Sequence, residues 1–350
     1  MIKFKENIIS NLNSAREALK RLDTLPDTVS RTLFVINDED QLLGTITDGD
    51  IRRGLLNGLE ISTNISQYMN TSFKFLAKND KNQNQIIKKF KDNDIALLPV
   101  VEDGKLLKII DLNDIKTILP VAALIMAGGK GERLRPLTAN TPKPMLKVGD
   151  KPIIEHNIDR LVSYGINTIY ISVKYLKDQI IDYLGDGSSK GINIIYIEEE
   201  KALGTIGCLS MIPNLVHEEI LILNSDIITN IDYEDFYNFF KESDTRLSVA
   251  SIPYTVNVPY AVLDTEKSTI KSFKEKPSYT YYSNGGIYFL KSSAKDLIPH
   301  NEFYNATDLM TLLIDQGERI VHYPILGYWL DIGRHQDYLK AQEDIVHIKL

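Results

Sequence analysis

Short apolar runs alternate with amphipathic helical stretches along the chain after Pro120. The apolar runs are rich in β-branched residues and predict strands at 121–126, 168–173, 192–197, 219–224 and 247–252. The stretches between them have helical periodicity and predict helices at 152–164, 176–184, 205–211 and 233–242. Strands that alternate with helices are typical of right-handed βαβ units on a mainly parallel sheet. We therefore expect residues 119–350 to form one α/β domain.

The first third of the chain contains an internal repeat. Residues 33–51 and 97–115 align without gaps at an offset of 64. Each copy predicts two strands around an acidic turn, followed by an aspartate, Asp50 or Asp114, that begins a helix. Helical patterns also precede the copies, at 14–22 and 83–90. Units this small must pack on each other, so we expect an α+β module over residues 1–118, with repeats at about 1–60 and 61–118.

Composition and charge narrow the class of protein. The chain has 350 residues, and Asp and Glu (47) outnumber Lys and Arg (40), which gives a net charge of -7. We expect no nucleic-acid partner, because the sequence lacks the basic excess or stripe that phosphate backbones require. The longest nearly apolar run, 118–127, is about half of the roughly 20 residues that a membrane helix needs. A single cysteine, Cys208, and the absence of an apolar leader indicate a cytoplasmic protein that does not bind membranes.

A glycine-rich loop follows the first strand of the second domain. This loop, AGGKGERLRPLT at 127–138, contains Gly128, Gly129 and Gly131, and its backbone N–H groups are free to face a phosphate. Arg133 lies in the loop, and Lys143 follows ten residues later between two prolines. Cations that are fixed beside such a loop can clamp a phosphate, so the sequence predicts an anion site here.

These residues closely resemble the signature of the sugar-nucleotide pyrophosphorylases, nucleotidyltransferases that join a sugar 1-phosphate to a nucleoside triphosphate. The family pattern G-G-x-G-(S/T)-R-L-x-P-L-T followed by K-P matches throughout, except that Glu132 stands at the Ser/Thr position. Other family motifs follow in order: ALGTIG (202–207), LNSD (223–226), EKP (275–277), SNGGIYFL (283–290) and YWLDIGRHQDY (328–338). The resemblance implies a Rossmann-like domain with a mainly parallel sheet. It also implies transfer of a nucleoside monophosphate to a sugar 1-phosphate, with release of pyrophosphate.

The same resemblance implies roles for individual residues. Arg133 and Lys143 would hold the triphosphate and act in catalysis, while Asp226 and Asp331 would bind Mg²⁺, which suits a pair of carboxylates. The nucleotide would also meet backbone groups at Gly128, Gly129, Gly131 and Gly204. The sugar-phosphate side would involve Thr205, Glu275, Lys276, Asn284 and Gly285. Blander interpretations are a helix cap for a strand-end aspartate, a solvated turn for EKP, and a strand face for the tyrosines at 279–283.

The repeated module resembles a tandem cystathionine-β-synthase (CBS) pair. In that family a Thr-x-x-Asp pattern after the last strand contacts a nucleotide, and the first copy keeps it as Thr47 and Asp50. The second copy has Asp111 in place of the threonine, and a carboxylate there would repel phosphate. The first copy could bind a nucleotide effector, or the module could serve only structure and dimerisation. We expect a homo-oligomer.

The nucleotide base is predicted from hydrogen-bond chemistry. Guanine presents two donors beside one acceptor, and a carboxylate, which only accepts, suits it better than an amide does. In the family that the sequence resembles, the base-reading side chain precedes the LGT segment, which implies Glu198 as the first choice and Glu199 as the second. The glutamates could instead form a solvated loop. GTP is therefore the expected nucleotide, with thymidylyl or uridylyl transfer as the alternative.

The identity of the sugar is predicted from the family resemblance alone. CBS modules on such transferases resemble the guanylyltransferases of bacterial surface-sugar and legionaminic acid pathways. That likeness implies glucosamine 1-phosphate, with mannose and heptose 1-phosphates as alternatives. An alternative of another class is a catalytically inactive nucleotide sensor.

Overall fold

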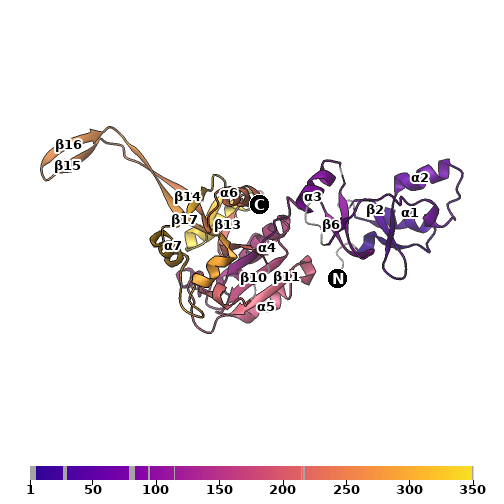
Figure 1. The fold of residues 1–350 in the computed structure, drawn as a ribbon, viewed down its shortest axis with the longest axis horizontal. Coiled ribbons are helices and arrows are strands. Elements are labelled where there is room, and N and C mark those ends of the chain that lie inside the picture. The colour runs from indigo at the N-terminus through magenta and orange to yellow at the C-terminus, as the bar shows by residue number, and fades with distance from the viewer. Residues whose placement is uncertain are drawn as a thin grey trace. The chain divides into compact units, whose positions relative to one another are not determined.

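The chain divides into two compact units (Figure 1). The computed structural model describes residues 5–26, 30–78, 83–93, 95–113, 115–213, 215, 217–348 and 350. The first unit comprises Met1–Ile118 with Ser163–Gly165 and Gly187–Gly191, and the second comprises the remainder. No helix within the described ranges is long and apolar enough to cross a membrane.

Both repeats of the first unit contain the same small sheet. In each, a short strand pairs in parallel with a second strand, which pairs antiparallel with a third. The first sheet consists of β1 (Ile8–Ser10), β2 (Thr32–Ile36) and β3 (Leu42–Thr47). The second consists of β4 (Leu76–Ala77), β5 (Leu97–Glu102) and β6 (Lys105–Asp111). The repeat predicted from the sequence is thus a repeat of structure.

The two repeats pack on each other through a shared apolar cluster. Its buried members come from both sheets and are Phe34, Leu42, Leu97, Val101, Leu106 and Ile109. Backbone hydrogen bonds also join the repeats, because the Leu42 N–H donates to the Gly104 carbonyl over 2.9 Å. The two repeats therefore pack on each other, as expected.

The helices of the first unit differ from expectation at one place. The described helices are α1 (Ala15–Thr24), α2 (Asp48–Leu56) and α3 (Gln83–Lys91). The helix predicted after the second repeat was wrong for the described residues 112, 113 and 115–118, which are not helical, and Asp114 lies outside the described residues. Pro120 and the strand that begins at Ala122 leave this copy too little chain for a stable helix.

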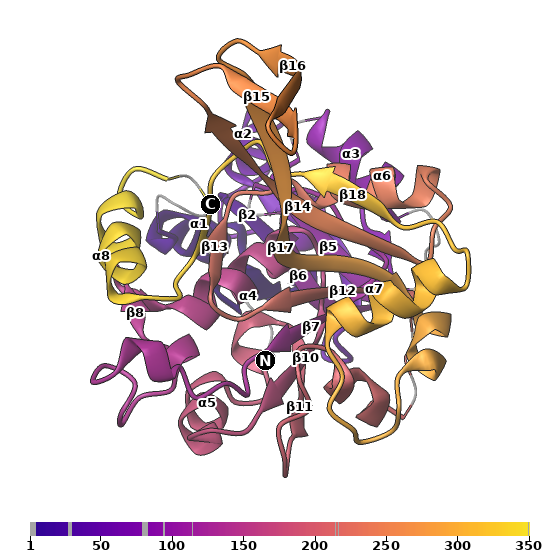
Figure 2. The ribbon, with the colours of Figure 1, turned by 90° about the vertical axis from the view of Figure 1, so that its left-hand side faces the viewer.

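The second unit is built on a seven-stranded sheet with the order β11-β10-β7-β12-β17-β14-β18 (Figure 2). These strands are β7 (Ala122–Met126), β10 (Thr168–Val173), β11 (Asn193–Glu198), β12 (Glu219–Asn224), β14 (Leu247–Asn257), β17 (Ser278–Lys291) and β18 (Val321–Pro324). Only β17 runs antiparallel to its neighbours. The predicted α/β fold with a mainly parallel sheet is confirmed.

Helices cover both faces of this sheet, as Figure 2 shows for α4 and α5 on one side and α7 on the other. The helices of this unit are α4 (Ile153–Ser163), α5 (Lys177–Leu184), α6 (Tyr233–Glu242), α7 (Ala306–Asp315) and α8 (His335–Asp344). Ile220 and Ile222 of β12 belong to one apolar cluster with Leu309 of α7. Burial on both faces explains why the strands read as nearly continuous apolar runs.

The helix predicted over 205–211 was wrong in type and extent. A 3-10 helix, η6, spans only Gly207–Met211. The N–H groups of Ile206 and Gly207 both donate to the Tyr304 carbonyl, over 3.1 Å each, instead of continuing a helical ladder. This tertiary contact overrides the local helical pattern.

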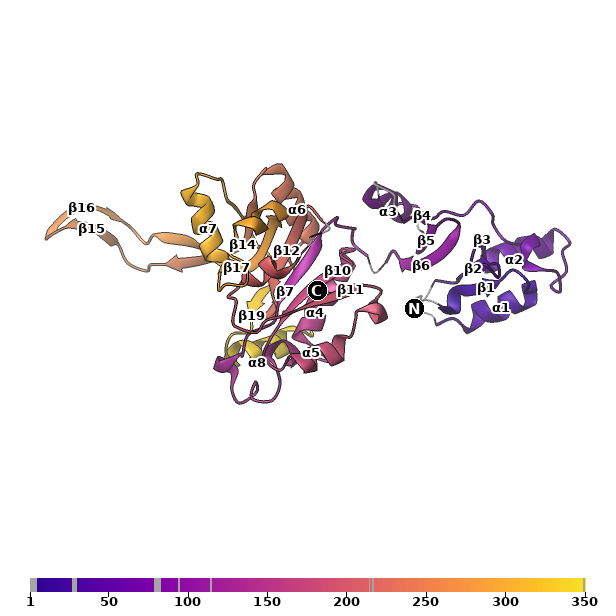
Figure 3. The ribbon, with the colours of Figure 1, turned by 60° about the horizontal axis from the view of Figure 1, so that its bottom comes forward.

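Strands β14 and β17 continue beyond the sheet as a long two-stranded arm (Figures 1 and 3). We use "the arm" for residues 253–282, which include β15 (Val262–Glu266) and β16 (Thr269–Lys274). The strand pairing runs without a register shift from Ser251 opposite Asn284 to Asn257 opposite Ser278. The tyrosine-rich stretch at 279–283 therefore lies in a strand, as expected.

Candidate active site

The candidate site lies where the parallel strands β7 and β12 end. In parallel sheets the carboxyl ends of neighbouring strands meet at one edge, which is where ligands bind in such folds. The glycine-rich loop follows β7, and Asp226 follows β12. Two short strands, β13 (Ile227–Thr229) and β19 (Trp329–Asp331), then pair antiparallel and place Ile227 opposite Asp331. The topology thus brings together two aspartates that are far apart in sequence.

Lys143 lies between these aspartates. It begins a 3-10 helix, η4 (Lys143–Met145), and is only 9% exposed. Its ammonium forms an ion pair with Oδ2 of Asp226 and lies 3.9 Å from Oδ1 of Asp331. A single buried cation therefore faces two carboxylates.

Both aspartates retain unused hydrogen-bonding capacity. Oδ1 of Asp226 and Oδ1 of Asp331 are buried and have no hydrogen-bond partner. Burial, with a further contribution from the charge of Asp226, raises the pKa of Asp331 to about 6, although Lys143 and Arg133 oppose the shift. Unpaired buried carboxylate oxygens are unfavourable unless a ligand uses them. This oxygen donor set fits Mg²⁺, and no cluster of three or more His, Cys, Asp or Glu occurs in the described part of the chain.

The glycine-rich loop packs tightly against the lysine. Gly131 has φ of 61°, and a Cβ there would lie 3.0 Å from the Cβ of Lys143. The Thr138 hydroxyl donates to the Gly131 carbonyl over 2.8 Å, which fixes the turn. Apart from Gly129 and its two chain neighbours, no heavy atom of the described residues lies within 4 Å of the position that a Cβ on Gly129 would occupy, so the loop is open at that point.

Arg133 approaches Asp331 from the loop. It lies in η3 (Glu132–Leu134), and its charge acts on Asp331. The nearest atoms to a Cβ built on Gly333 are Oδ2 of Asp331 at 3.5 Å and Nη2 of Arg133 at 3.6 Å. Arg133, Lys143, Asp226 and Asp331 therefore converge, which is the arrangement that the family resemblance implies.

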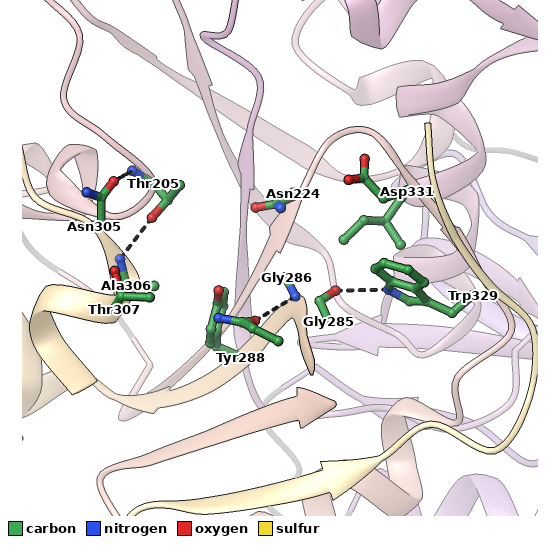
Figure 4. A pocket seen from close by; sticks show the side chains of 12 residues that line it. Thr205, Asn224, Gly285, Gly286, Tyr288, Asn305, Ala306, Thr307, Trp329 and Asp331 are labelled. Carbon is green, nitrogen blue, oxygen red and sulfur yellow. Dashed lines mark hydrogen bonds between the residues drawn. The ribbon is translucent and has the colours of Figure 1, made fainter. Parts of the chain in front are cut away.

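A pocket of about 270 Å³ opens beside Asp331 (Figure 4). Four of the predicted residues line it, namely Thr205, Asn284, Gly285 and Asp331. The Asn284 side chain accepts a hydrogen bond from the Gly286 N–H over 2.9 Å, and the Trp329 indole donates to the Gly285 carbonyl over 2.9 Å. Asp331 is the only charged residue in the lining, so the pocket is mainly neutral and polar.

Asn224, Asn305, Thr307 and Trp329 also line the pocket, although they were not predicted as site residues. Two hydrogen bonds join Thr205 to the start of α7. The Thr205 N–H donates to Asn305 Oδ1 over 3.3 Å, and the Ala306 N–H donates to the Thr205 hydroxyl over 2.8 Å. The N-x-x-D pattern at 305–308, a capping box before an apolar run, is the sequence signal that could have placed the start of α7.

Gly204 holds the turn that presents Thr205. Its φ is 75°, and a Cβ there would lie 2.6 Å from the Tyr304 carbonyl oxygen. A side chain at this position would therefore clash with the backbone that leads into α7. The turn at Gly204 therefore requires a residue without a side chain. The Thr205 hydroxyl accepts a hydrogen bond from the N–H of Ala306, the first residue of α7.

The two candidate base-reading glutamates lie in different surroundings. Glu198 forms an ion pair with Lys177 on the surface. Glu199 lies beside the glycine-rich loop, where a Cβ on Gly128 would be 3.2 Å from its Oε1. It accepts hydrogen bonds from the Ser172 hydroxyl and, over 3.1 Å, from the Leu203 N–H. The structure thus places the second choice, Glu199, next to the loop and the first choice away from it.

Glu275 and Lys276 lie on the arm, between β16 and β17, and do not line the pocket. Lys276 and Asn284 are eight positions apart, which corresponds to about 25 Å along an extended strand. Lys276 has φ of 43°, a left-handed conformation that is unusual for a residue before proline. These two predicted residues are therefore not brought to the other site residues.

In the first CBS repeat, Thr47 and Asp50 form a capping box at the start of α2. The Thr47 N–H donates to Asp50 Oδ2 over 2.8 Å, and Arg53 pairs with Asp50 Oδ1 at 2.6 Å. Both carboxylate oxygens are thus engaged locally, with Thr47 as the N-cap residue and Asp50 three residues later. In the second repeat, Asp111 Oδ1 accepts from the Asn113 N–H over 2.9 Å.

Comparisons with known proteins agree with this architecture. Residues 122–347 match the model of the nucleotidyl transferase family, and residues 11–57 and 65–120 match that of the CBS domain. The mannose-1-phosphate guanyltransferase of Debaryomyces hansenii is 30% identical over 62% of this chain and 62% of its own length. The bifunctional protein GlmU of Methanocaldococcus jannaschii is 33% identical over 63% of this chain and 53% of its own length. The chain thus spans less than two thirds of these relatives.

A solved structure shares the fold of the second unit. The crystal structure of HddC from Yersinia pseudotuberculosis, complexed with GMP-PN, aligns with a TM-score of 0.51 and 25% identity. The alignment covers 64% of this chain and 99% of HddC. The chain belongs to the nucleotidyl transferase family and carries two CBS domains ahead of its transferase domain.

Proposed function

We propose that the chain transfers a nucleoside monophosphate from a nucleoside triphosphate to a sugar 1-phosphate and releases pyrophosphate. The observation that carries this proposal is the convergence of Lys143, Arg133, Asp226 and Asp331 beside a glycine-rich loop and a neutral polar pocket. Family membership and the names of similar proteins, such as mannose-1-phosphate guanyltransferase, support it.

The reaction asks little of acid–base catalysis. An oxygen of the sugar phosphate is already an anion and forms a bond to the α-phosphorus, while the bond from that phosphorus to the oxygen that bridges to the β-phosphate breaks. Two polyanions must be held in line, so positioning and charge stabilisation dominate. Lys143 and Arg133 would offset the charge on the transferring group. Asp226 and Asp331 would hold Mg²⁺, which when bound would neutralise phosphate oxygens.

The pocket beside Asp331 would take the sugar. Asn224, Asn284 and Thr307 offer amide and hydroxyl groups to its lining, which suits sugar hydroxyls. The expected sugar is glucosamine 1-phosphate, with mannose and heptose 1-phosphates as alternatives, and this expectation rests on the family resemblance.

Glu199 would read the base and select GTP. A carboxylate has about four lone-pair sites, so two remain for guanine after the bonds from Ser172 and Leu203. Guanine supplies two donors, N1–H and the N2 amino group, where uracil and thymine supply one. The similar proteins named guanyltransferases, and the HddC complex with GMP-PN, support this choice.

The first CBS repeat remains the candidate site for a nucleotide effector, through Thr47 and Asp50. The compartment we propose is the cytoplasm, where nucleoside triphosphates are available and the single thiol, Cys208, stays reduced.

A matrix of nucleoside triphosphates against sugar 1-phosphates, assayed for pyrophosphate release with Mg²⁺, tests the proposal. GTP should exceed UTP and dTTP by at least about tenfold in kcat/KM, because an unpaired buried hydrogen-bonding group costs about 1–3 kcal/mol. Equal turnover with UTP would overturn the guanine assignment alone. Failure of every pair with folded protein would overturn the transferase and leave the nucleotide sensor.

A further inference from the structure

The arm exposes an unusual amount of apolar surface. Large apolar side chains that are more than a third exposed occur along its whole length, namely Tyr254, Val256, Tyr260, Leu263, Ile270, Phe273, Tyr281 and Tyr282. Nearly every residue of β15 and β16 is exposed. An isolated two-stranded ribbon is marginally stable in water, so a ribbon with this surface needs a covering partner.

Part of the exposed apolar surface lies on one face of each strand pair. Tyr282, which lies opposite Pro253, is on the other face of the β14–β17 pair. Residues directly opposite each other in an antiparallel pair share a face, and Tyr254 lies opposite Tyr281 while Leu263 lies opposite Phe273. On the other face, Thr255 lies opposite Thr280. An apolar face backed by a more polar one is the pattern of a sheet that packs against another surface on one side.

The arm also carries part of the predicted active site. Glu275 and Lys276 lie on it, about 25 Å along the strand from the pocket residue Asn284, as estimated from the strand rise. The unbroken pairing between Asn284 and Ser278 resists bending, so a return of Lys276 to the pocket of its own chain would break backbone hydrogen bonds. If Glu275 and Lys276 bind the sugar phosphate, they must reach a surface that contains a sugar-phosphate pocket. A second copy of this chain has such a pocket.

We propose that the arm packs its apolar face on a second copy of this chain and delivers Lys276 and Glu275 to that copy's sugar-phosphate pocket. This inference rests on the proposed function. A two-fold symmetric pair would exchange arms, so each copy would complete the other's site. Four rings, those of Tyr254, Tyr260, Phe273 and Tyr281, are 59% to 76% exposed. At roughly 200 Å² per ring, each arm then presents about 530 Å² of exposed ring surface. Two arms and the surfaces they cover would then reach the roughly 1,600 Å² of a standard interface.

Hybrid dimers of two impaired full-length variants test this inference. We use "the body" for the second unit without the arm. Asp226→Asn impairs the body, and Lys276→Ala impairs the arm. If the arm acts on the partner, a hybrid combines the intact body of one copy with the intact arm of the other and keeps one working site. Co-expression with two different affinity tags, purification through both tags and an assay of pyrophosphate release should then give about half of the wild-type rate per dimer.

The matched control is a hybrid of Asp226→Asn with Asp331→Asn, since both changes lie in the body and no site is restored. Failure to capture a hybrid through both tags would overturn the inference, as would a captured hybrid that is no more active than the single variants. A Lys276→Ala protein with full activity would overturn it as well. If the wild-type protein itself releases no pyrophosphate, the proposed function fails first, and the two failures are thereby distinguished.

A second measurement addresses the apolar face alone. Tyr254→Ser with Phe273→Ser should convert the dimer to monomer by light scattering, because both rings would be buried against the partner. Thr255→Ser with Thr280→Ser, on the opposite face, should leave the mass unchanged. A wild-type monomer at assay concentration, or a dimer that survives loss of the rings, contradicts an interface made by this face.

Discussion

The body and the arm of the transferase unit each carry family motifs, but only the body brings its residues together. Lys143, Asp226 and Asp331 come from three distant segments and meet within ion-pairing distance. Glu275 and Lys276 are adjacent in sequence and lie on an exposed ribbon. In the body, parallel strands end at a common edge, so topology alone makes the residues converge. On the arm, the arrangement that we propose is completed by a partner surface.

The largest expected effect is on the body. Asp226→Asn or Asp331→Asn should each lower kcat by about 10²–10³-fold, since both remove a main source of charge stabilisation from the site. Steady-state pyrophosphate release measures the loss, and circular dichroism checks that the fold persists. Asp182→Asn, an exposed change on α5, is the matched control. Losses below about tenfold would contradict the two-aspartate assignment.

Substitution on the arm should act more selectively. Lys276→Ala should lower kcat/KM for the sugar 1-phosphate by about tenfold to a hundredfold, because a hydrogen bond to a charged group is worth about 1.5–3 kcal/mol. The KM for GTP should change much less. Lys271→Ala, which removes an exposed arm lysine that pairs with Glu266, is the control. Equal effects of the two lysine variants would contradict a role for the arm in binding the sugar 1-phosphate.

Two adjacent glutamates allow a sharper test of base reading. Glu199→Gln should reduce the preference for GTP over UTP by about tenfold, because the amide replaces one acceptor with a donor that faces a guanine donor. Glu198→Gln should leave this ratio unchanged, since that carboxylate pairs with Lys177 on the surface. Competition between the two nucleotides in one assay measures the ratio directly. The reverse outcome would restore Glu198 as the reader.

The smallest effect on turnover is expected from the first unit. Deletion of residues 1–118 removes no residue of the body or the arm, so catalysis should persist with less loss than in any variant above. The deletion should instead change the oligomeric state or the response to added nucleotides, read by light scattering and by titration of the assay with adenine and guanine nucleotides. A folded, truncated protein that matches the full chain in both properties would exclude a regulatory and a dimerising role.

The mainly parallel sheet could be predicted because local pattern and topology agree. Asp226 was expected from the family motif, and the structure places it directly after β12, at the edge where the parallel strands end. Its role as a metal ligand stays a prediction. The choice between Glu198 and Glu199 depends on which face of the sheet each side chain points to at the end of β11. A shift of one residue reverses the face, so a family motif placed only approximately could not decide it.

Other features depend on contacts that no local pattern reveals. The start of α7 joins the pocket because Asn305 and Thr205 hydrogen-bond across a hundred residues. The helix in the structure is shorter than the one predicted at 205–211, because two N–H groups of this segment donate to the Tyr304 carbonyl instead. The length of the arm follows from the pairing of β14 with β17, and that pairing is not encoded in either strand alone.

The proposed nucleotidyl transfer is tested most directly by following the α- and γ-phosphorus atoms of GTP into the products. The wild-type protein should be incubated with Mg²⁺, glucosamine 1-phosphate and GTP labelled at either the α- or the γ-phosphorus. The account predicts that the α label enters a nucleotide sugar, that the γ label enters pyrophosphate, and that Asp226→Asn abolishes both transfers. Appearance of the γ label in inorganic phosphate without a nucleotide sugar, or no conversion with any sugar 1-phosphate, would contradict it.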